Sequence, residues 1–88
     1  MAEKKTDQGY VDVPLSRPMS IDGAQVKVLR MREPTVADQL VSEEMKGSDS
    51  AKEIAMFANL CEVATDDIKR LTLKDYKKLQ VAFMDFIG

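Results

Sequence analysis

The sequence has no histidine, no tryptophan and a single cysteine, Cys61. Without histidine, the chain lacks the commonest general base and metal ligand, and every nucleophile arrangement that pairs serine or cysteine with histidine. A lone cysteine forms no disulfide within the chain and no cysteine-based metal cluster, and this usage is typical of a reducing cytoplasm. The four glycines are scattered singly and make no phosphate-binding loop. We therefore expect a protein that is not an enzyme, with no catalytic residue, cofactor or metal.

Long apolar runs and an excess of one charge are also missing. No apolar run approaches the ~20 residues that span a bilayer, and the N-terminus has no apolar segment of the kind found in signal peptides. Thirteen basic and fifteen acidic residues give a formal charge of −2 at pH 7, which argues against general nucleic-acid binding. The length of 88 residues corresponds to one small domain, near the lower limit for a self-sufficient core. A single-domain protein of the cytosol, with no membrane contact, is expected.

A β-hairpin is indicated in the first third of the chain. Asp22-Gly23 favours the positive φ angles of a tight turn, and extended, apolar-alternating runs flank it. The first run begins at Tyr10 and contains two prolines, which are typical of an edge strand or of a strand with breaks. Its end, 19–21, should pair with 25–32 across the turn. Within 25–32 the apolar side chains change face, which predicts a bulge or a strand covered on both sides.

Helix-start signals recur after the hairpin. Pro34 ends the second strand, and Thr35 with Asp38 makes a capping-box pair that opens a helix. The same reasoning places further N-caps at Ser50, Thr65 and Thr72. The helices are expected at about 36–46, 51–64, 66–71 and 73–87.

These segments define a fold class. Residues 1–9 are polar and bury nothing, so we expect a disordered tail. Residues 10–88 are predicted to form one α+β domain, a short N-terminal β-hairpin followed by a compact bundle of three to four helices. In the first helix the apolar residues share one broad side, the pattern of an amphipathic helix. They are Val36, Ala37, Leu40, Val41 and Met45.

The second helix carries two apolar stripes. One is expected to face the core, with the cysteine as a buried small hydrophobe. The other has the i, i+4, i+7 spacing of a helix face. A helix with two apolar faces is either central in its fold or covered by another chain, and both explanations remain open. The core stripe consists of Ile54, Phe57, Ala58 and Cys61, and the second stripe of Met56, Leu60 and Val63.

The last helix shows a weaker version of the same pattern. Two apolar residues, Val81 and Met84, fall outside its core stripe. That core stripe consists of Tyr76, Leu79, Phe83, Phe86 and Ile87. Our hypothesis is that the two stray residues and the second stripe of the preceding helix bind a partner or another copy of the chain. The candidate partner-binding residues are Met56, Leu60, Val63, Val81 and Met84.

One basic concentration could mimic a DNA reader of the helix-turn-helix type, using the helices at 51–64, 66–71 and 73–87. Three aspartates interrupt it and no excess positive charge supports it elsewhere, so a solvated helix face is the better interpretation. A small DNA-binding regulator remains an alternative. The basic residues are Lys69, Arg70, Lys74, Lys77 and Lys78, and the aspartates are Asp66, Asp67 and Asp75.

Two regions carry a resemblance to a known family. The first combines Leu-Ser-Arg-Pro at 15–18 and Ile-Asp-Gly at 21–23 with Leu-Arg-Met-Arg-Glu-Pro-Thr-Val at 29–36. The second is the ending Asp-Tyr-Lys-Lys-Leu-Gln at 75–80, followed by Phe83. Together they resemble the small tail assembly chaperones of contractile-tailed bacteriophages, including the Mu-like group, over about 13–87.

The resemblance implies a non-enzymatic protein that is encoded by a phage or prophage and acts in the host bacterial cytoplasm. Such chaperones bind the tape measure protein, keep it soluble until the tail tube assembles around it, and are absent from the mature virion. Many such systems also make a longer form of the chaperone by translational frameshifting, so a longer frameshifted form of the chain is a further candidate partner. A second copy of the chain is a candidate partner from the second stripe, Met56, Leu60 and Val63. A structural minor tail component that stays in the particle is the remaining alternative.

Overall fold

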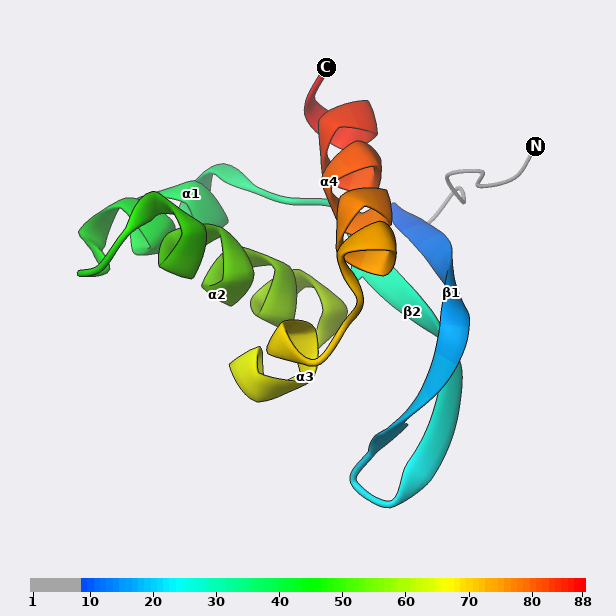
Figure 1. Ribbon diagram of the computed structural model, residues 1–88. Coiled ribbons are helices and arrows are strands. Elements are labelled where there is room, and N and C mark those ends of the chain that lie inside the picture. The colour runs from blue at the N-terminus through cyan, green and yellow to red at the C-terminus, as the bar shows by residue number, and fades with distance from the viewer. Residues whose placement is uncertain (1–8) are drawn as a thin grey trace.

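The computed structural model describes residues 9–88 and begins with a long antiparallel hairpin, β1 (Tyr10–Ile21) and β2 (Ala24–Arg32) (Figure 1). The turn between the strands has Asp22 at φ 51° and Gly23 at φ 82°, as predicted. The predicted disordered tail at 1–9 lies outside the described residues except for Gly9. The carbonyl of Gly9 accepts the Glu33 N–H at 2.7 Å, so this residue extends the hairpin.

The hairpin contains the predicted bulge, but the extra residues belong to β1. Pro14 pairs with Val28 and Met19 with Val26, so residues 15–18 lie opposite Lys27 alone. Proline has no N–H to donate, and Pro18 falls in the stretch that leaves the ladder. This confirms the prediction, made from the two prolines, that the first strand has a break.

Four helices follow the hairpin, which confirms the α+β class (Figure 1). α4 packs against β1, α2 packs against β2, and both α1 and α3 pack against α2. The helices are α1 (Val36–Glu44), α2 (Asp49–Cys61), α3 (Thr65–Lys69) and α4 (Leu73–Ile87).

Two of the predicted caps are confirmed. Thr35 and Asp38 form the complete capping box of α1, since the Thr35 hydroxyl accepts from the Asp38 N–H and the Asp38 carboxylate accepts from the Thr35 N–H. The Thr72 hydroxyl accepts the Asp75 N–H at 3.2 Å and so caps α4.

The other two caps were predicted at the wrong residues. Ser48 caps α2 in place of Ser50, because the positive φ of Gly47 (124°) turns the chain two residues earlier. α2 ends at Cys61, not Ala64, since Glu62 adopts the left-handed conformation at φ 59°. The N-cap of α3 is Ala64, not Thr65, so no hydroxyl caps this helix. The Asp67 carboxylate instead accepts the Ala64 N–H at 3.0 Å.

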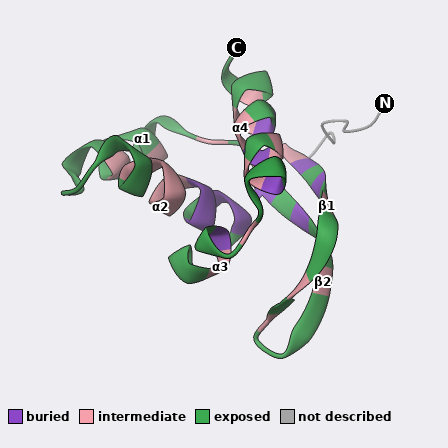
Figure 2. Cartoon of the chain, in the orientation of Figure 1, coloured by how far each residue is buried: buried purple, intermediate pink, exposed green. Residues whose placement is uncertain are grey.

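The core forms where one face of the hairpin meets α2, α3 and α4 (Figure 2). Phe57 lies at its centre, with its ring 5.6 Å from that of Tyr76 and 5.7 Å from that of Phe83. From the predicted core stripe of α4, Ile87 is a correction: it is 57% exposed, because the last residue of α4 lies beyond the core. The buried apolar residues are Val11, Val13, Leu29, Met31, Phe57, Ala58, Leu60, Cys61, Ile68, Leu79 and Ala82.

Candidate protein-interaction surface

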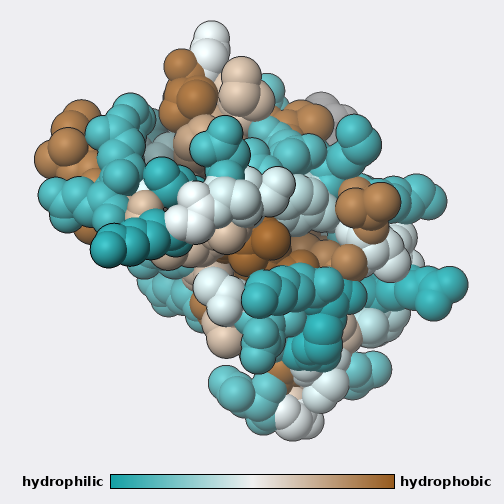
Figure 3. All heavy atoms as spheres, turned by 60° about the vertical axis from the view of Figure 1, so that its left-hand side comes forward, coloured by the Kyte–Doolittle hydropathy of each residue, from teal (hydrophilic) through white to brown (hydrophobic). Residues whose placement is uncertain are grey.

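α1 is seated with its polar side inward and its apolar side toward solvent. Asp38 and Ser42 are its half-buried residues, and no residue of α1 is buried (Figure 2). Val36 is 78% exposed, Leu40 54% and Val41 60%. An amphipathic helix ordinarily turns its apolar side to the core, so this orientation is the reverse of the usual one. On the side of the molecule that carries α1 and α2, apolar patches lie among polar surface (Figure 3).

Asp38 holds α1 in this orientation. Its carboxylate accepts two hydrogen bonds of 2.9 Å from the Arg32 guanidinium, at the end of β2. It also accepts from the Asn59 side chain of α2 at 3.1 Å. The Arg32 hydrogen bonds, with those from Thr35, lower the pKa of Asp38 well below its usual range despite its partial burial. One ionised side chain therefore joins β2, α1 and α2.

Acidic residues accompany the exposed apolar side of α1. At 100° per residue, Glu44 lies between Leu40 and Val41 on the helix surface, and Glu43 lies at the edge. Glu43 accepts a hydrogen bond of 3.1 Å from Gln39 and remains exposed. We name this surface the α1 face. It consists of Val36, Ala37, Leu40 and Val41, with Glu43 and Glu44; Met45 lies beyond the end of α1, as its C-cap.

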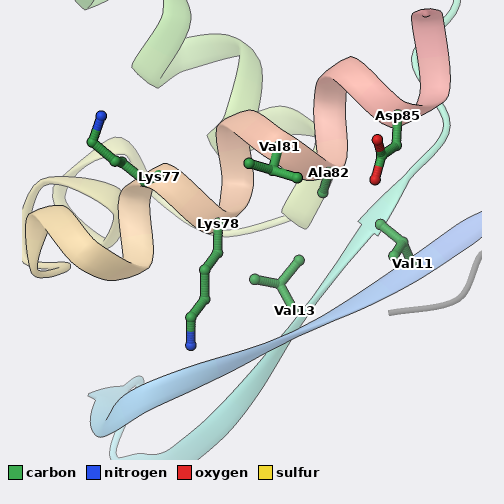
Figure 4. A pocket seen from close by; sticks show the side chains of 7 residues that line it. All are labelled: Val11, Val13, Lys77, Lys78, Val81, Ala82 and Asp85. Atoms are coloured by element: carbon green, nitrogen blue, oxygen red, sulfur yellow. The ribbon is translucent and has the colours of Figure 1, made fainter. Parts of the chain in front are cut away.

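α4 presents a second exposed apolar surface. Val81 is 60% exposed, Met84 57% and Leu73 80%. A groove of about 210 Å³ lies between α4 and β1, and a second of about 250 Å³ runs past Val81 and Met84. Figure 4 shows the first groove from close by, lined by Val11, Val13, Lys77, Lys78, Val81, Ala82 and Asp85.

Lysines accompany this second surface. The ammonium of Lys78 donates to the Pro14 carbonyl at 2.9 Å and lies 3.5 Å from the Asp75 carboxylate, so it is engaged within the domain. Lys74 and Lys77 are exposed, and neither forms a salt bridge with another described residue. We name this surface the α4 face. It consists of Leu73, Val81 and Met84, with Lys74, Lys77 and Asp85, and Asp85 lines both grooves.

The predicted partner-binding residues divide between surface and core. Val81 and Met84 are exposed, as expected from their place outside the core stripe. Leu60 is 1% exposed, so its prediction as a surface residue is wrong. Met56 and Val63 are partly buried and pack against the core. The physical reason is that α2 is central: β2, α1 and α3 all pack on it.

Leu60 and Val63 do line the wall of a third groove. This groove, of about 420 Å³, lies between the hairpin and the end of α2. Val28, on β2, is 46% exposed beside it. The α1 face was not predicted from the sequence as an exposed surface. Its apolar pattern was visible, but the direction in which it points depends on Asp38 and its partners.

These surfaces combine exposed apolar side chains with charged ones. Among residues 9–88, no group of three or more acidic or cysteine side chains could hold a metal ion. Burial raises the pKa of the Cys61 thiol to about 12, which keeps it protonated and unreactive at neutral pH. No helix in the described part of the chain is long and apolar enough to cross a membrane. Apolar faces flanked by charge are suited to amphipathic helices.

Comparison with known protein families identifies the family of this chain. Residues 12–88 match the family described as phage tail assembly chaperone proteins, E, or 41 or 14. The chain belongs to this family, as the resemblance at 13–87 predicted. No curated protein and no solved structure matches it.

Proposed function

We propose that this chain is a non-enzymatic chaperone that binds the tape measure protein of its phage in the host cytoplasm. It keeps that protein soluble until the tail tube assembles around it, and it is absent from the mature virion. Residues 10–88 act as one functional domain. The observation that supports this proposal is the exposure of Val81 and Met84 on α4, where Val81 lines two grooves and Met84 lines one of them, together with the exposure of Leu73 at the start of the helix.

The α4 face fits a helical client. A tape measure protein has long apolar helical faces that need cover before the tube forms, and an amphipathic helix can place its apolar side chains over Val81 and Met84. Lys74 and Lys77 would then lie near acidic side chains of the client. A contact area of a few side chains is small compared with a stable interface, so the client can be released to the tube subunits.

Co-expression of the tape measure protein with this chain, followed by a pull-down, tests the proposal. We expect soluble tape measure protein when the chain is present and insoluble protein when it is omitted. A V81E/M84E double variant should lose recovery at least about tenfold, because two client contacts become charged. Val28→Glu, an exposed apolar residue outside both the α1 and α4 faces, is the matched control and should retain it.

Two outcomes would contradict the proposal. The first is insoluble tape measure protein even when the chain and any longer frameshifted form of it are both supplied. The second is detection of the chain in purified virions by mass spectrometry. That result would instead favour a structural tail component.

A further inference from the structure

The two edges of the hairpin differ in how their backbone groups are used. In an antiparallel pair, residues that exchange hydrogen bonds alternate with residues whose N–H and C=O point away from the partner strand. The hydrogen bond from the Glu33 N–H to the Gly9 carbonyl sets this alternation along the hairpin. The outward-pointing residues therefore include Pro14 on β1, and Val28 and Arg30 on β2.

Helices α3 and α4 close the outer edge of β1. Three of their side chains form hydrogen bonds of 2.9 Å with backbone groups of this strand. The pairs are Lys78 with the Pro14 C=O, Asp75 with the Ser16 N–H, and Arg70 with the Ser20 C=O. The two prolines of β1 also present no N–H. This edge is therefore closed to a further strand.

The outer edge of β2 has no such cover. Within residues 9–88, the outward backbone groups of Val28 and Arg30 form no hydrogen bond, and β2 contains no proline. The groove of about 420 Å³ between the hairpin and the end of α2 lies beside this edge. Its apolar lining includes Val28, Leu29, Leu60 and Val63. Unpaired edge groups beside an apolar groove are suited to an extended peptide, whose backbone pairs with the strand while alternate side chains enter the groove.

The charges of β2 indicate which strand fits. Its charged residues are all basic, namely Lys27, Arg30 and Arg32. Two copies of β2 paired edge to edge would bring like charges together, which is destabilising. A strand from another protein, with acidic residues on the face of Arg30, would instead bring opposite charges together. On the other face its side chains should be apolar, because they would meet Leu60 and because Glu62 also lines the groove.

We propose that the outer edge of β2 binds an extended segment of another protein, as a third strand of the sheet. The segment has apolar and acidic residues in alternation and covers about five residues, opposite 28–32. Its acidic side chains face Arg30, which pairs with Asp12 but keeps a side chain that is 59% exposed. This edge is separate from the α4 face, and the inference does not rest on the tape measure protein.

A synthetic peptide of alternating valine and glutamate is the probe for this edge. It is titrated into the isotope-labelled full chain, and the backbone amides are followed by NMR. The amide signals of Val28 and Arg30 should shift. Hydrogen exchange at these two N–H groups should slow at least about tenfold at saturation, because a bound strand gives them hydrogen-bond acceptors.

Two variants of the chain test the backbone and the charge separately. Val28→Pro removes one outward N–H without removing a hydrogen bond to β1, so the peptide should bind at least about tenfold more weakly. Because proline can also strain a strand, Arg30→Glu serves as a second, exposed variant. It should weaken binding of the valine–glutamate peptide about fivefold and strengthen binding of a valine–lysine peptide. The V81E/M84E double variant, altered on the α4 face, is the matched control and should bind like the wild type.

Methylation of the peptide backbone distinguishes a third strand from simple occupation of the groove. The N–H groups of a strand point alternately to its two edges, so methylating the glutamate nitrogens blocks one edge and methylating the valine nitrogens blocks the other. Only one of the two methylated peptides should lose affinity for the chain.

Three results would overturn the inference. One is a titration to about 1 mM peptide that leaves the amides of Val28 and Arg30 unchanged. Another is equal binding of the parent peptide and both methylated peptides, since the groove would then act without the strand edge. The third is binding that neither Val28→Pro nor Arg30→Glu alters. None of these results involves the tape measure protein, so they leave the chaperone proposal to its own test.

Discussion

The guanidinium of Arg32 and the carboxylate of Asp38 form two parallel hydrogen bonds of 2.9 Å across the junction between β2 and α1. The same carboxylate completes the capping box with Thr35 and accepts from Asn59 on α2. Because Asp38 lies on the polar side of α1, this set of hydrogen bonds turns that side toward the domain. The apolar side then faces solvent, where it can contact another chain.

Replacing Asp38 by alanine should lower the free energy of unfolding by about 2 kcal/mol, from the loss of a helix cap and a charge-assisted pair. Urea unfolding at pH 7 measures this loss of stability. Asp12→Ala is the matched control, because Asp12 also pairs with an arginine, Arg30, but both side chains are more than half exposed. The control should show no resolvable change. Equal losses in the two variants would mean that the junction contributes no more than a surface pair.

The stability of the protein should fall in acid partly because of Asp38. Its folded-state pKa lies below the unfolded value of about 3.9, so its contribution is fully present above that pH and is lost as the pH falls through the folded value. Asp75 shifts in the same direction, because hydrogen bonds from Ser16 and Lys78 outweigh its burial. Urea unfolding between about pH 5 and pH 2 should show a shallower decline for Asp38→Asn than for the wild type. Parallel declines would contradict this assignment.

Leu60→Asp should unfold the protein, because it places a carboxylate in the core beside Phe57. Leu60→Ala should cost about 2–5 kcal/mol, the range for a buried leucine. Val81→Ala, at an exposed position, should change stability by less than about 0.5 kcal/mol. Circular dichroism and urea titration separate these outcomes. A folded Leu60→Asp protein with normal helix content would show that Leu60 is a surface residue after all.

The Asp75 side chain joins α4 to the outer edge of β1. It is 2% exposed and accepts from the Ser16 backbone N–H at 2.9 Å and from the Ser16 hydroxyl at 3.1 Å. Asp75→Asn should cost about 1–3 kcal/mol, because a buried acceptor becomes in part a donor facing other donors. Ser16→Ala removes only the hydroxyl and should cost about 1 kcal/mol or less. Equal costs in urea unfolding would mean that the hydroxyl, not the backbone N–H, makes the important contact.

The confirmed predictions concern short-range physics. The Asp22-Gly23 turn and the Thr35 cap depend on the conformational preferences of neighbouring residues, which the sequence states directly. The cap of α2 is also a local feature, but it was predicted two residues too late. It follows the positive φ of Gly47, directly before Ser48, and a sequence pattern does not display that backbone angle.

The sequence by itself determined that the chain is a hairpin followed by amphipathic helices, that it lacks the residues of common catalytic sites, and that its family is recognisable. Periodicity shows that a helix has an apolar side, but not what that side meets. The tertiary structure decided that Leu60 lies under the hairpin and that Leu40 lies in solvent. The physical reason is that both outcomes depend on contacts between distant elements, above all those that Asp38 makes with Arg32 and Asn59.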